Sequence, residues 1–430
     1  MNRREFLLRS LGAGSAAVGC AAYSRRTKAA SETPNIVLIL ADDLGYECLG
    51  CYGSASYQTP VLDSLARTGI RFERCHAQPL CTPSRVKLMT GKHNFRNYRA
   101  FGVLDPGEYT FAHLLKQRGY ATCVAGKWQL YGRQQGWEGK GSMPEQAGFD
   151  EYCLWQVKEL GERYANPTVL RNGMLETLEG AYGPDVYSDA IIDFIKRHRG
   201  KPFFAYYPMC LVHNPFEPTP DSPEWDTARG QQDDKYFDDM VAYMDKTVGR
   251  IVDALAELGL RENTLLLFTG DNGTNQRISS KMRDGSLISG AKGLTLDTGT
   301  HVPLIANWPG VIPEGRVCGD LIDFADFLPT FAEVAGGALP REQVVDGRSF
   351  LPQLLGQKGN PHEALLCYYD PRWGNRERAC FARDKEWKLY DNGRLFNVKD
   401  DPLEQHPISG EIQGAAAARA KLEKVLEIVP

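Results

Sequence analysis

Two uninterrupted apolar runs, each followed by acidic or amide side chains, constrain the fold of this chain most. The runs cover Asn35–Leu40 and Thr264–Phe268, and the polar residues that follow are Asp42 and Asp43 after the first run and Asp271 and Asn272 after the second. Apolar runs without alternation are typical of strands buried on both faces, as in a parallel sheet covered by helices. Ligands of such sheets bind at the carboxyl ends of the strands, so these polar side chains are candidates for ligand binding.

The chemistry of the same side chains predicts a metal ion. Adjacent carboxylates repel each other unless a cation or hydrogen-bond donors compensate for their charge. Asp42, Asp43, Asp271 and Asn272 offer only hard oxygen atoms, which suit Ca²⁺ or Mg²⁺ and not zinc. Because calcium accepts an irregular, higher-coordinate arrangement more readily, we expect Ca²⁺ in preference to Mg²⁺.

Strands and helices are expected to alternate along most of the chain. Further strands are predicted over residues 70–72, 120–125 and 203–207, and helices over 61–68, 84–90, 110–118, 185–198, 236–258 and 323–334. This alternation predicts an α/β fold with a large, mostly parallel sheet flanked by helices. Residues 131–184 show little periodicity, and we expect a loop-rich insertion there.

The pattern changes after about residue 336. Short strand-like runs at 364–369, 379–383, 387–390 and 394–397, with a hairpin signal at Asp391-Asn392-Gly393, predict a small antiparallel sheet, followed by a helix over 414–428. We therefore divide the chain into residues 1–30 as a signal and linker, 34–340 as the α/β domain that carries the predicted site, and 341–430 as an α+β subdomain.

Composition excludes some classes of protein. With 42% hydrophobic and 24% charged residues the chain is an ordinary globular protein, and its net charge of −4 gives no basic surface for nucleic acid. The eleven cysteines suit neither a zinc site nor a small disulfide scaffold. Cys48 and Cys51 form the only close pair and no second pair follows, so we expect unpaired cysteines.

The first residues are predicted to direct export. Asn2-Arg3-Arg4-Glu5-Phe6-Leu7 resembles a twin-arginine signal, and the apolar stretch that follows is too short to span a membrane. Ala17-Val18-Gly19-Cys20 resembles a lipobox, which makes Cys20 a candidate for a lipid anchor, with simple cleavage as the alternative. We expect a protein of the periplasm or cell envelope. Export after folding in the reducing cytoplasm fits unpaired cysteines.

The stretch Cys81-Thr82-Pro83-Ser84-Arg85 is the most specific motif of the chain. Pro83 has the fixed φ of a first helical turn, so Cys81 is expected at a helix N-terminus, where backbone N–H groups favour an anion. The stretch closely resembles the active-site signature of the type I sulfatases, which have the alkaline phosphatase-like fold. Further motifs in the family's order extend the resemblance from Asn35 to Gln405, among them Gly126-Lys127-Trp128, Gly290-Ala291-Lys292-Gly293, Val302-Pro303 and Asp401-Pro402-Leu403-Glu404.

The resemblance implies a mechanism for hydrolysis of sulfuric esters. Cys81 is expected to be converted to formylglycine by a maturation enzyme, and one hydroxyl of the hydrated aldehyde attacks sulfur. Modified Cys81 is also implied as a ligand of the calcium ion, beside the four oxygen ligands. His213 is the implied proton donor to the leaving alcohol, and Lys127, Lys292 and Arg85 gather negative charge. Lys127, His213 and Lys292 also belong to the implied substrate-binding set.

Two positions of this predicted set depart from the family pattern. Gln129 stands where the family has a histidine that takes a proton, and an amide does not accept a proton at neutral pH. His301 stands where an arginine is usual. We include Gln129 and His301 among the substrate-binding residues. Three explanations remain open: another base such as His93 or His301 serves, water serves, or a sulfated intermediate is trapped.

The expected substrate is a sulfated oligo- or polysaccharide. Export places the protein among such polymers, and Trp128, Trp137, Trp155 and Trp373 offer rings that stack on sugars or else belong to the core. One alternative is a phosphonate or phosphate ester hydrolase of the same superfamily. Another is a catalytically impaired binder of sulfated glycans, which the residues at positions 129 and 301 motivate.

Overall fold

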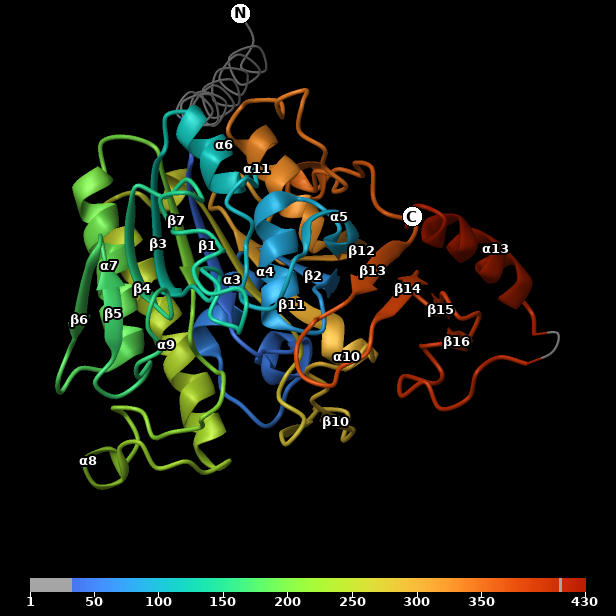
Figure 1. Cartoon of the computed structure of the whole chain (residues 1–430), viewed down its shortest axis with the longest axis horizontal. Helices are drawn as coiled ribbons and strands as arrows, with labels where there is room; N and C mark the ends of the chain where they lie inside the picture. Colours follow the sequence, from blue (N-terminus) through green and yellow to red (C-terminus); the bar gives the residue numbers. More distant parts are fainter. Residues whose placement is uncertain (1–32, 410–411) are drawn as a thin grey trace, which may run out of the picture.

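The computed structural model describes residues 33–409 and 412–430, so the predicted signal and Cys20 lie outside the described residues. A large sheet has the strand order β12-β2-β11-β8-β1-β7-β3-β4-β5-β6 (Figure 1). Its strands are β1 (Asn35–Ala41), β2 (Ile70–His76), β3 (Ala121–Lys127), β4 (Glu151–Trp155), β5 (Thr168–Arg171), β6 (Met174–Thr177), β7 (Phe203–Pro208), β8 (Thr264–Gly270), β11 (His301–Asn307) and β12 (Arg316–Asp323).

The centre of this sheet is parallel. β1 pairs in parallel with β7 and β8, β7 with β3, and β3 with β4, whereas β11 runs antiparallel to β8 and β2. At the centre, Ala41 lies beside Gly270, so the carboxyl ends of β1 and β8 are level. The predicted α/β class with a mostly parallel sheet is confirmed.

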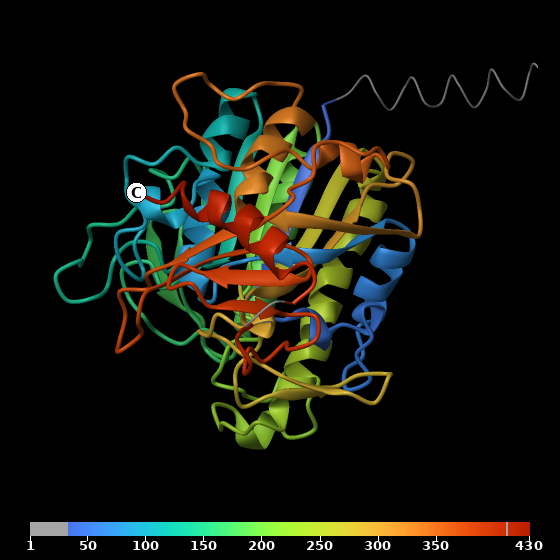
Figure 2. The ribbon, with the colours of Figure 1, turned by 90° about the vertical axis from the view of Figure 1, so that its right-hand side faces the viewer.

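Helices cover both faces of the sheet, as Figure 2 shows from the side. One face carries α4 (Cys81–Thr90), α6 (Phe111–Gln117) and α11 (Phe327–Val334), and the other carries α3 (Pro60–Arg67), α7 (Gly183–His198) and α9 (Tyr236–Glu257). Ile36, Leu38 and Leu40 of β1 belong to the first core, and Val37, Ile39 and Ala41 to the second. Both faces of β1 are thus buried, which explains its unbroken apolar sequence.

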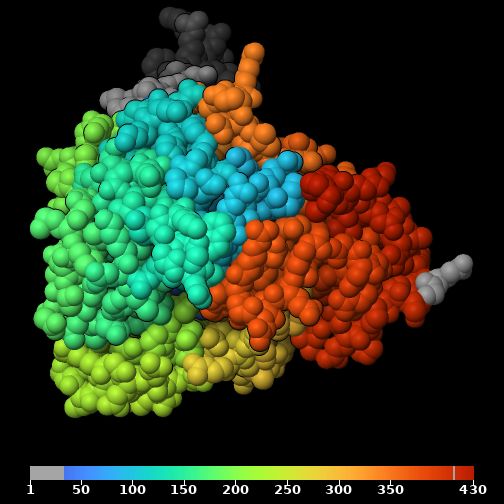
Figure 3. All heavy atoms as spheres, in the orientation of Figure 1, coloured from blue at the N-terminus to red at the C-terminus, as the bar shows by residue number. Residues whose placement is uncertain are grey.

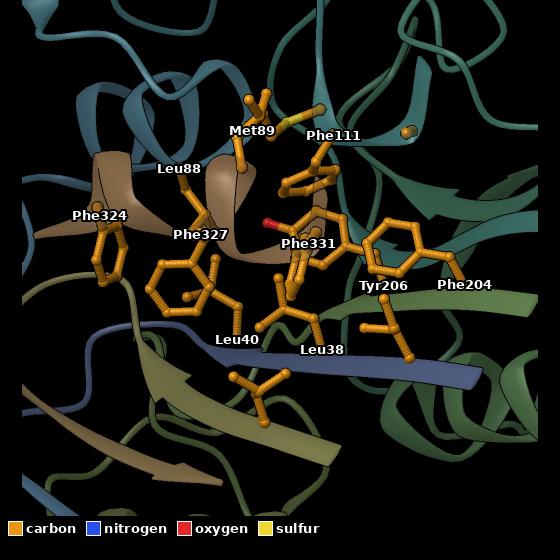
Figure 4. Close-up of a cluster of buried hydrophobic side chains, with 14 of the residues drawn as sticks. Leu38, Leu40, Leu88, Met89, Phe111, Phe204, Tyr206, Phe324, Phe327 and Phe331 are labelled. Carbon is orange, nitrogen blue, oxygen red and sulfur yellow. The ribbon is translucent and has the colours of Figure 1, made fainter. Parts of the chain in front are cut away.

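The core between β1 and α4 fixes the position of the predicted nucleophile. Figure 4 shows Leu38 and Leu40 of β1 facing Leu88 and Met89 of α4, with aromatic rings of α6, β7 and α11 around them. Phe111 packs edge to face on Phe204, Tyr206 and Phe331. Since every residue of α4 is buried, the helix and Cys81 at its start are held on all sides.

The sequence analysis missed five strands of the large sheet. The segment 131–184, expected as a loop-rich insertion, contributes β4, β5 and β6 and so forms one edge of the large sheet. These strands are only four or five residues long, and β6 is mostly exposed, so neither run length nor apolar pattern marks them. β11 and β12 were not predicted; β12 ends at Asp323, and the expected helix begins after it.

The C-terminal part forms the predicted antiparallel sheet. Its order is β13 (Leu365–Tyr369), β14 (Ala379–Arg383), β15 (Trp387–Tyr390) and β16 (Leu395–Asn397), and α13 (Ala415–Leu426) packs on it. Shorter helices include α5 (Asn94–Asn97), α8 (Trp225–Ala228), α10 (Asp297–Thr300) and α12 (Leu351–Leu354), and β9 (Ser279–Lys281) pairs with β10 (Leu287–Ser289). Figure 3 shows the orange and red C-terminal part packed against the blue to cyan part of the α/β domain.

The cysteines in the described part of the chain are all unpaired, as predicted. Cys48 is buried beside the hydroxyl groups of Thr274 and Ser280, and Cys51 does not bond to it. No helix of residues 33–409 or 412–430 has the length and apolar character needed to cross a bilayer.

Candidate active site

The polar residues after β1 and β8 meet at one edge of the sheet. The backbone N–H of Asp271 donates to the carbonyl of Ala41 at 2.9 Å, which extends the strand pairing by one residue. The N–H of Asp43 donates to Asp271 Oδ1 at 3.1 Å, and Asn272 Nδ2 donates to Asp43 Oδ1 at 2.9 Å. All four predicted metal ligands from the strand ends are fully buried, so the structure brings them together.

Cys81 faces this group of carboxylates. Its Sγ and ligand oxygens of Asp42 and Asp271 all lie within 4.8 Å of one another. The Cys81 side chain is 2% exposed, and Sγ donates to Gln129 Oε1 at 3.1 Å. Burial raises the pKa of the Cys81 thiol, although Lys127 opposes the shift. α4 begins at Cys81, as the sequence predicted, so unpaired backbone N–H groups of the first turn lie at the site.

Two buried cations, Lys127 and Arg85, and the partly buried Lys292 balance the three carboxylates. Lys127 Nζ donates to Asp42 at 2.7 and 2.9 Å, and Lys292 Nζ donates to Asp43 Oδ2 at 2.5 Å. Arg85 donates to Asp271 Oδ2 from Nε at 3.0 Å, and its Nη1 donates to the carbonyl of Lys127. The site is therefore a network of opposite charges at the ends of β1, β3 and β8.

The charges shift the pKa values of the carboxyl groups in opposite directions. Burial alone would raise the pKa of Asp42, but Lys127, His213 and Arg85 hold it well below its usual range. Asp43 is likewise shifted down against its burial, by His213 and Lys292, so its pKa is lowered. Burial and the nearby Asp42 raise the pKa of Asp271 to about 7, against the effect of Arg85.

His213 lies just beyond β7 and contacts the same network. Its Nε2 is 2.9 Å from Lys292 Nζ and 3.7 Å from Asp43 Oδ2. Its Nδ1 contacts the carbonyl oxygen of Asn214. Burial and Lys292 lower the pKa of His213 to about 3, despite Asp43. The ring is therefore neutral at pH 7, with Nδ1–H donating to Asn214 and Nε2 accepting from Lys292.

The two residues that depart from the family pattern have different surroundings. Gln129, in the left-handed region with φ of 54°, presents its amide to Cys81. His301 begins β11, and its ring nitrogens contact Asp297 Oδ2 at 3.1 Å and the Glu73 carbonyl at 2.6 Å. These contacts of His301 lie outside the group of side chains around Cys81.

His93, the other histidine considered as a base, also has its own surroundings. Its ring stacks on Phe95 at 6.0 Å, and its backbone N–H donates to Asp346. Burial and Lys87 lower the pKa of His93 to about 4.

Sequence reasoning missed Arg163. Its Nη1 lies 3.2 Å from His213 Nδ1, and its guanidinium lies 4.2 Å from the centre of the Trp155 ring. The residue follows β4, in the segment that was expected to be a loop. No local pattern marks it, because only the pairing of β4 with β3 brings the segment to the site.

The donor atoms fit a hard cation. The Oδ1 atom of Asn272 is buried and has no hydrogen-bond partner among the described residues. The Nδ2 atom of the same side chain donates to Asp43 Oδ1. A buried amide oxygen without a donor is costly, and a cation that prefers oxygen would satisfy it together with Asp42, Asp43 and Asp271.

Comparison with known proteins identifies the family to which the chain belongs. The family model described as Sulfatase matches residues 34–338, which is more than half of the chain. The chain belongs to the sulfatase family. A second model, described as N-sulphoglucosamine sulphohydrolase, C-terminal, matches residues 291–429 of the sulfatase.

Relatives and solved structures agree with this assignment. The sulfatase is 35% identical to arylsulfatase A of Homo sapiens over 465 aligned positions, which cover 93% of this chain and 88% of the relative. It superposes on Ps i-CgsB with a TM-score of 0.77 at 26% identity, covering 92% of each chain. A structure titled as BT4656 in complex with its substrate D-glucosamine-2-N,6-O-disulfate has a TM-score of 0.75 at 22% identity, covering 92% of this chain and 97% of the other. The protein is a sulfuric ester hydrolase.

Proposed function

We propose that this sulfatase releases sulfate from a sulfated carbohydrate, with formylglycine derived from Cys81 as the nucleophile and Ca²⁺ as the cofactor. The observation that carries the proposal is the meeting of Cys81 Sγ with the carboxylates of Asp42 and Asp271, all within 4.8 Å. A thiol that lies among carboxylates and lysines contributes little to hydrophobic packing. The same position suits an oxidised side chain that must receive a sulfate group.

Asp42, Asp43, Asp271 and Asn272 would hold the calcium ion, with modified Cys81 as a further oxygen ligand. The bound ion would supply positive charge that favours ionisation of a nucleophilic hydroxyl and attracts the sulfate oxygens. The lysines that now contact Asp42 and Asp43 support this, because their ammonium groups show that the pocket favours positive charge. Magnesium is less suited, since it demands a regular octahedral shell.

The chain's own groups bind and polarise the ester. Lys127 contacts Asp42 and Lys292 contacts Asp43, so both ammonium groups belong to the charged network that Cys81 faces. Charged donors preorganised in a dry site stabilise charge that develops in a transition state. Arg85 donates to Asp271 and to the carbonyl of Lys127, so it holds both residues in place.

His213 would deliver the proton to the leaving alcohol. Its Nε2 lies 2.9 Å from Lys292 Nζ, within the charged network that Cys81 faces, and this nitrogen would carry the proton that passes to the alcohol oxygen. The contact of Nδ1 with the carbonyl of Asn214 fixes the orientation of the ring.

Release of sulfate needs a proton acceptor near Cys81. Gln129 accepts a hydrogen bond from Cys81 Sγ and holds no proton acceptor of useful basicity. The contacts of His93 with Phe95 and of His301 with Asp297 and Glu73 favour water over either ring as the acceptor. We propose a working enzyme in which water that Gln129 positions takes this proton.

A carbohydrate substrate is supported by the structural neighbours. Ps i-CgsB has been solved in complex with k-i-k-neocarrahexaose, and this complex superposes with a TM-score of 0.76 at 26% identity. Of the tryptophans considered for stacking on sugars, Trp128 and Trp155 are buried core residues, whereas Trp373 is 40% exposed.

The test combines chemistry at Cys81 with a substrate screen. Peptide mass spectrometry measures the fraction of Cys81 that is converted to the aldehyde in protein made with a maturation enzyme. The same protein is then assayed on sulfated saccharides, p-nitrophenyl sulfate and p-nitrophenyl phosphate. Sulfate release that scales with the aldehyde fraction is expected. Binding of saccharides without any release, in fully converted protein, would support the impaired binder, and preferred hydrolysis of the phosphate would support the phosphate ester hydrolase.

We also propose that residues 1–30 direct export to the periplasm or cell envelope. The support is the Arg3-Arg4 pair and the short apolar stretch after it. Cell fractionation of the full chain and of an Arg3→Lys, Arg4→Lys variant measures this, and metabolic labelling with a fatty acid tests the lipid anchor at Cys20. If both proteins remain in the cytoplasm, the proposal of export is wrong.

A further inference from the structure

The segment of residues 370–378, between β13 and β14, is fixed in place although it is exposed. The hydroxyl of Tyr98 donates to the carbonyl of Pro371 at 2.8 Å. Arg372 donates from Nη1 to the carbonyl of Arg99 at 2.9 Å and from Nε to Asp370 at 2.8 Å. These bonds tie the start of the segment to the loop after α5, so the residues that follow have a defined place.

An arginine on this segment is oriented by stacked rings. Trp373 stacks on Phe101 with ring centres 4.5 Å apart and an angle of 15° between the planes. The guanidinium of Arg376 lies 4.6 Å from the centre of the Trp373 ring. Within residues 33–409 and 412–430, Arg376 makes no ion pair and donates no hydrogen bond, whereas Arg378, two residues on, pairs with Asp391.

Arg376 lies beside the active site. A Cβ atom built on Gly293, the residue after Lys292, would be 3.2 Å from Arg376 Nε and 3.7 Å from a methyl group of Leu80, the residue before Cys81. The chain around Gly293 is fixed as well, because its N–H donates to the carbonyl of Pro79 at 2.8 Å and its carbonyl accepts from Tyr369. The guanidinium thus stands next to Gly293, the neighbour of Lys292, on a side of this glycine that Leu80 also approaches.

The hydrolysis of a single sulfate group does not need the guanidinium of Arg376. Lys127, Lys292 and the start of α4 already provide the positive charge for the group that reacts. An exposed guanidinium that rings hold in place, without a carboxylate of its own, is suited to a planar, two-pronged contact with an anion from outside. Gly293 leaves room for this arrangement, because any side chain there would approach the guanidinium.

We propose that Arg376 binds a second anionic group, a sulfate or a carboxylate, of the carbohydrate whose sulfate ester is hydrolysed. The inference rests on the proposed function and narrows it: the substrate is a glycan with at least two anionic groups, not a neutral sugar with a single sulfate. Trp373 acts as a positioning residue for the guanidinium. The reacting sulfate sits at Cys81, and the second anion sits on the side of the site formed by the 370–378 segment.

The experiment compares Arg376→Gln with wild type on probes with one and two anionic groups. The probes are p-nitrophenyl sulfate, singly sulfated neutral disaccharides, and disaccharides with two sulfates or with one sulfate and one carboxylate. For wild type we expect the highest kcat/KM on the last group. Arg376→Gln should raise KM for that group about 10- to 100-fold, as the loss of a charged hydrogen-bonding partner does, and should change the kinetics on p-nitrophenyl sulfate less than about twofold.

Further variants separate a contact with substrate from a general effect. Arg376→Lys keeps the charge but loses the two-pronged geometry, so it should recover part of the selectivity. Arg378→Gln removes one positive charge from the same segment and should behave as wild type on every probe. Trp373→Leu should raise KM for the doubly charged disaccharides and leave p-nitrophenyl sulfate unaffected.

The outcomes distinguish this inference from the proposed function. If converted wild type hydrolyses neither the aryl ester nor any saccharide, the proposed function fails and the inference falls with it. If it hydrolyses p-nitrophenyl sulfate but prefers singly sulfated neutral disaccharides, or accepts no disaccharide, the inference alone is wrong. Equal losses for Arg376→Gln on all probes, or equal losses for Arg376→Gln and Arg378→Gln, would also overturn it.

Discussion

The substitution Gln129→His tests how sulfate leaves the active site. Gln129 Oε1 accepts from Cys81 Sγ at 3.1 Å, and the backbone N–H of Gln129 donates to the carbonyl of Gln156 at 3.1 Å. The residue has a φ of 54°, a conformation that histidine tolerates better than most side chains. A histidine can therefore occupy the position and bring a ring nitrogen close to the side chain derived from Cys81.

The size of the effect follows from what an added base contributes. General acid–base catalysis by a positioned side chain is worth roughly 10²- to 10⁴-fold. If water now accepts the proton and this step limits turnover, Gln129→His should raise kcat by up to about 10²-fold, or about 2.7 kcal/mol of barrier. If another step limits turnover, kcat should stay within a few-fold of wild type. In both cases the substitution is not expected to be harmful.

The assay must separate the two halves of the reaction. Stopped-flow release of p-nitrophenol reports transfer of the sulfate group, and ion chromatography of free sulfate reports its release. Peptide mass spectrometry confirms equal conversion of Cys81 in wild type, Gln129→His and the control Gln129→Leu, which has no polar group. The reasoning is refuted if Gln129→His shows a burst of p-nitrophenol, kcat falls more than about tenfold, and the enzyme accumulates with sulfate attached. Gln129 would then have a positive role that a ring cannot replace.

Other predictions concern the cation, the proton donor and stability. Asn272→Leu removes the unpartnered buried oxygen, so the rise in melting temperature that Ca²⁺ gives wild type in scanning fluorimetry should disappear; an unchanged rise would exclude Asn272 as a ligand. His213→Gln should lower kcat about 10²-fold or more on alkyl sulfates and much less on p-nitrophenyl sulfate, whose leaving group needs no proton; equal losses on both esters would argue against proton donation. Asp245 accepts from the backbone N–H groups of Val61 and Leu62 at the start of α3, both at 2.9 Å, so Asp245→Ala should cost about 2–3 kcal/mol in urea unfolding. Burial raises the pKa of Asp245 to about 6, above the ordinary value of about 3.9, so its protonated form contributes stability below about pH 4 that is lost as the pH rises through about 6; Asp245→Asn should lack this loss, and identical pH profiles of the two proteins would contradict the shift.

The central strands and the polar residues that follow them could be predicted from the sequence, because the position of these strands in the sheet determines their local pattern. β1 and β8 are buried on both faces, which requires unbroken apolar residues, and the charges after them must face a ligand edge. The register Ala41 beside Gly270 then brings Asp42 and Asp271 together. The helix that begins at Cys81 was predictable for a similar reason, since Pro83 fits only a first turn.

The edge of the sheet and the surroundings of the site could not be predicted in the same way. β6 is mostly exposed and only four residues long, so pairing with β5 and not its own sequence makes it a strand. Arg163 reaches His213, and Arg376 reaches the neighbourhood of Lys292, through chain segments far away in sequence. Such contacts depend on how irregular segments pack, for which the chain carries no periodic signal.

The burial of α4 sets an order of events in biosynthesis. In the folded protein every residue of this helix is buried, and Cys81 is only 2% exposed. A maturation enzyme therefore cannot bind the backbone on either side of the thiol. The proposed oxidation must therefore happen on a nascent or still unfolded chain. If the proposed export signal carries folded protein, the aldehyde would be formed in the cytoplasm, before the protein is exported.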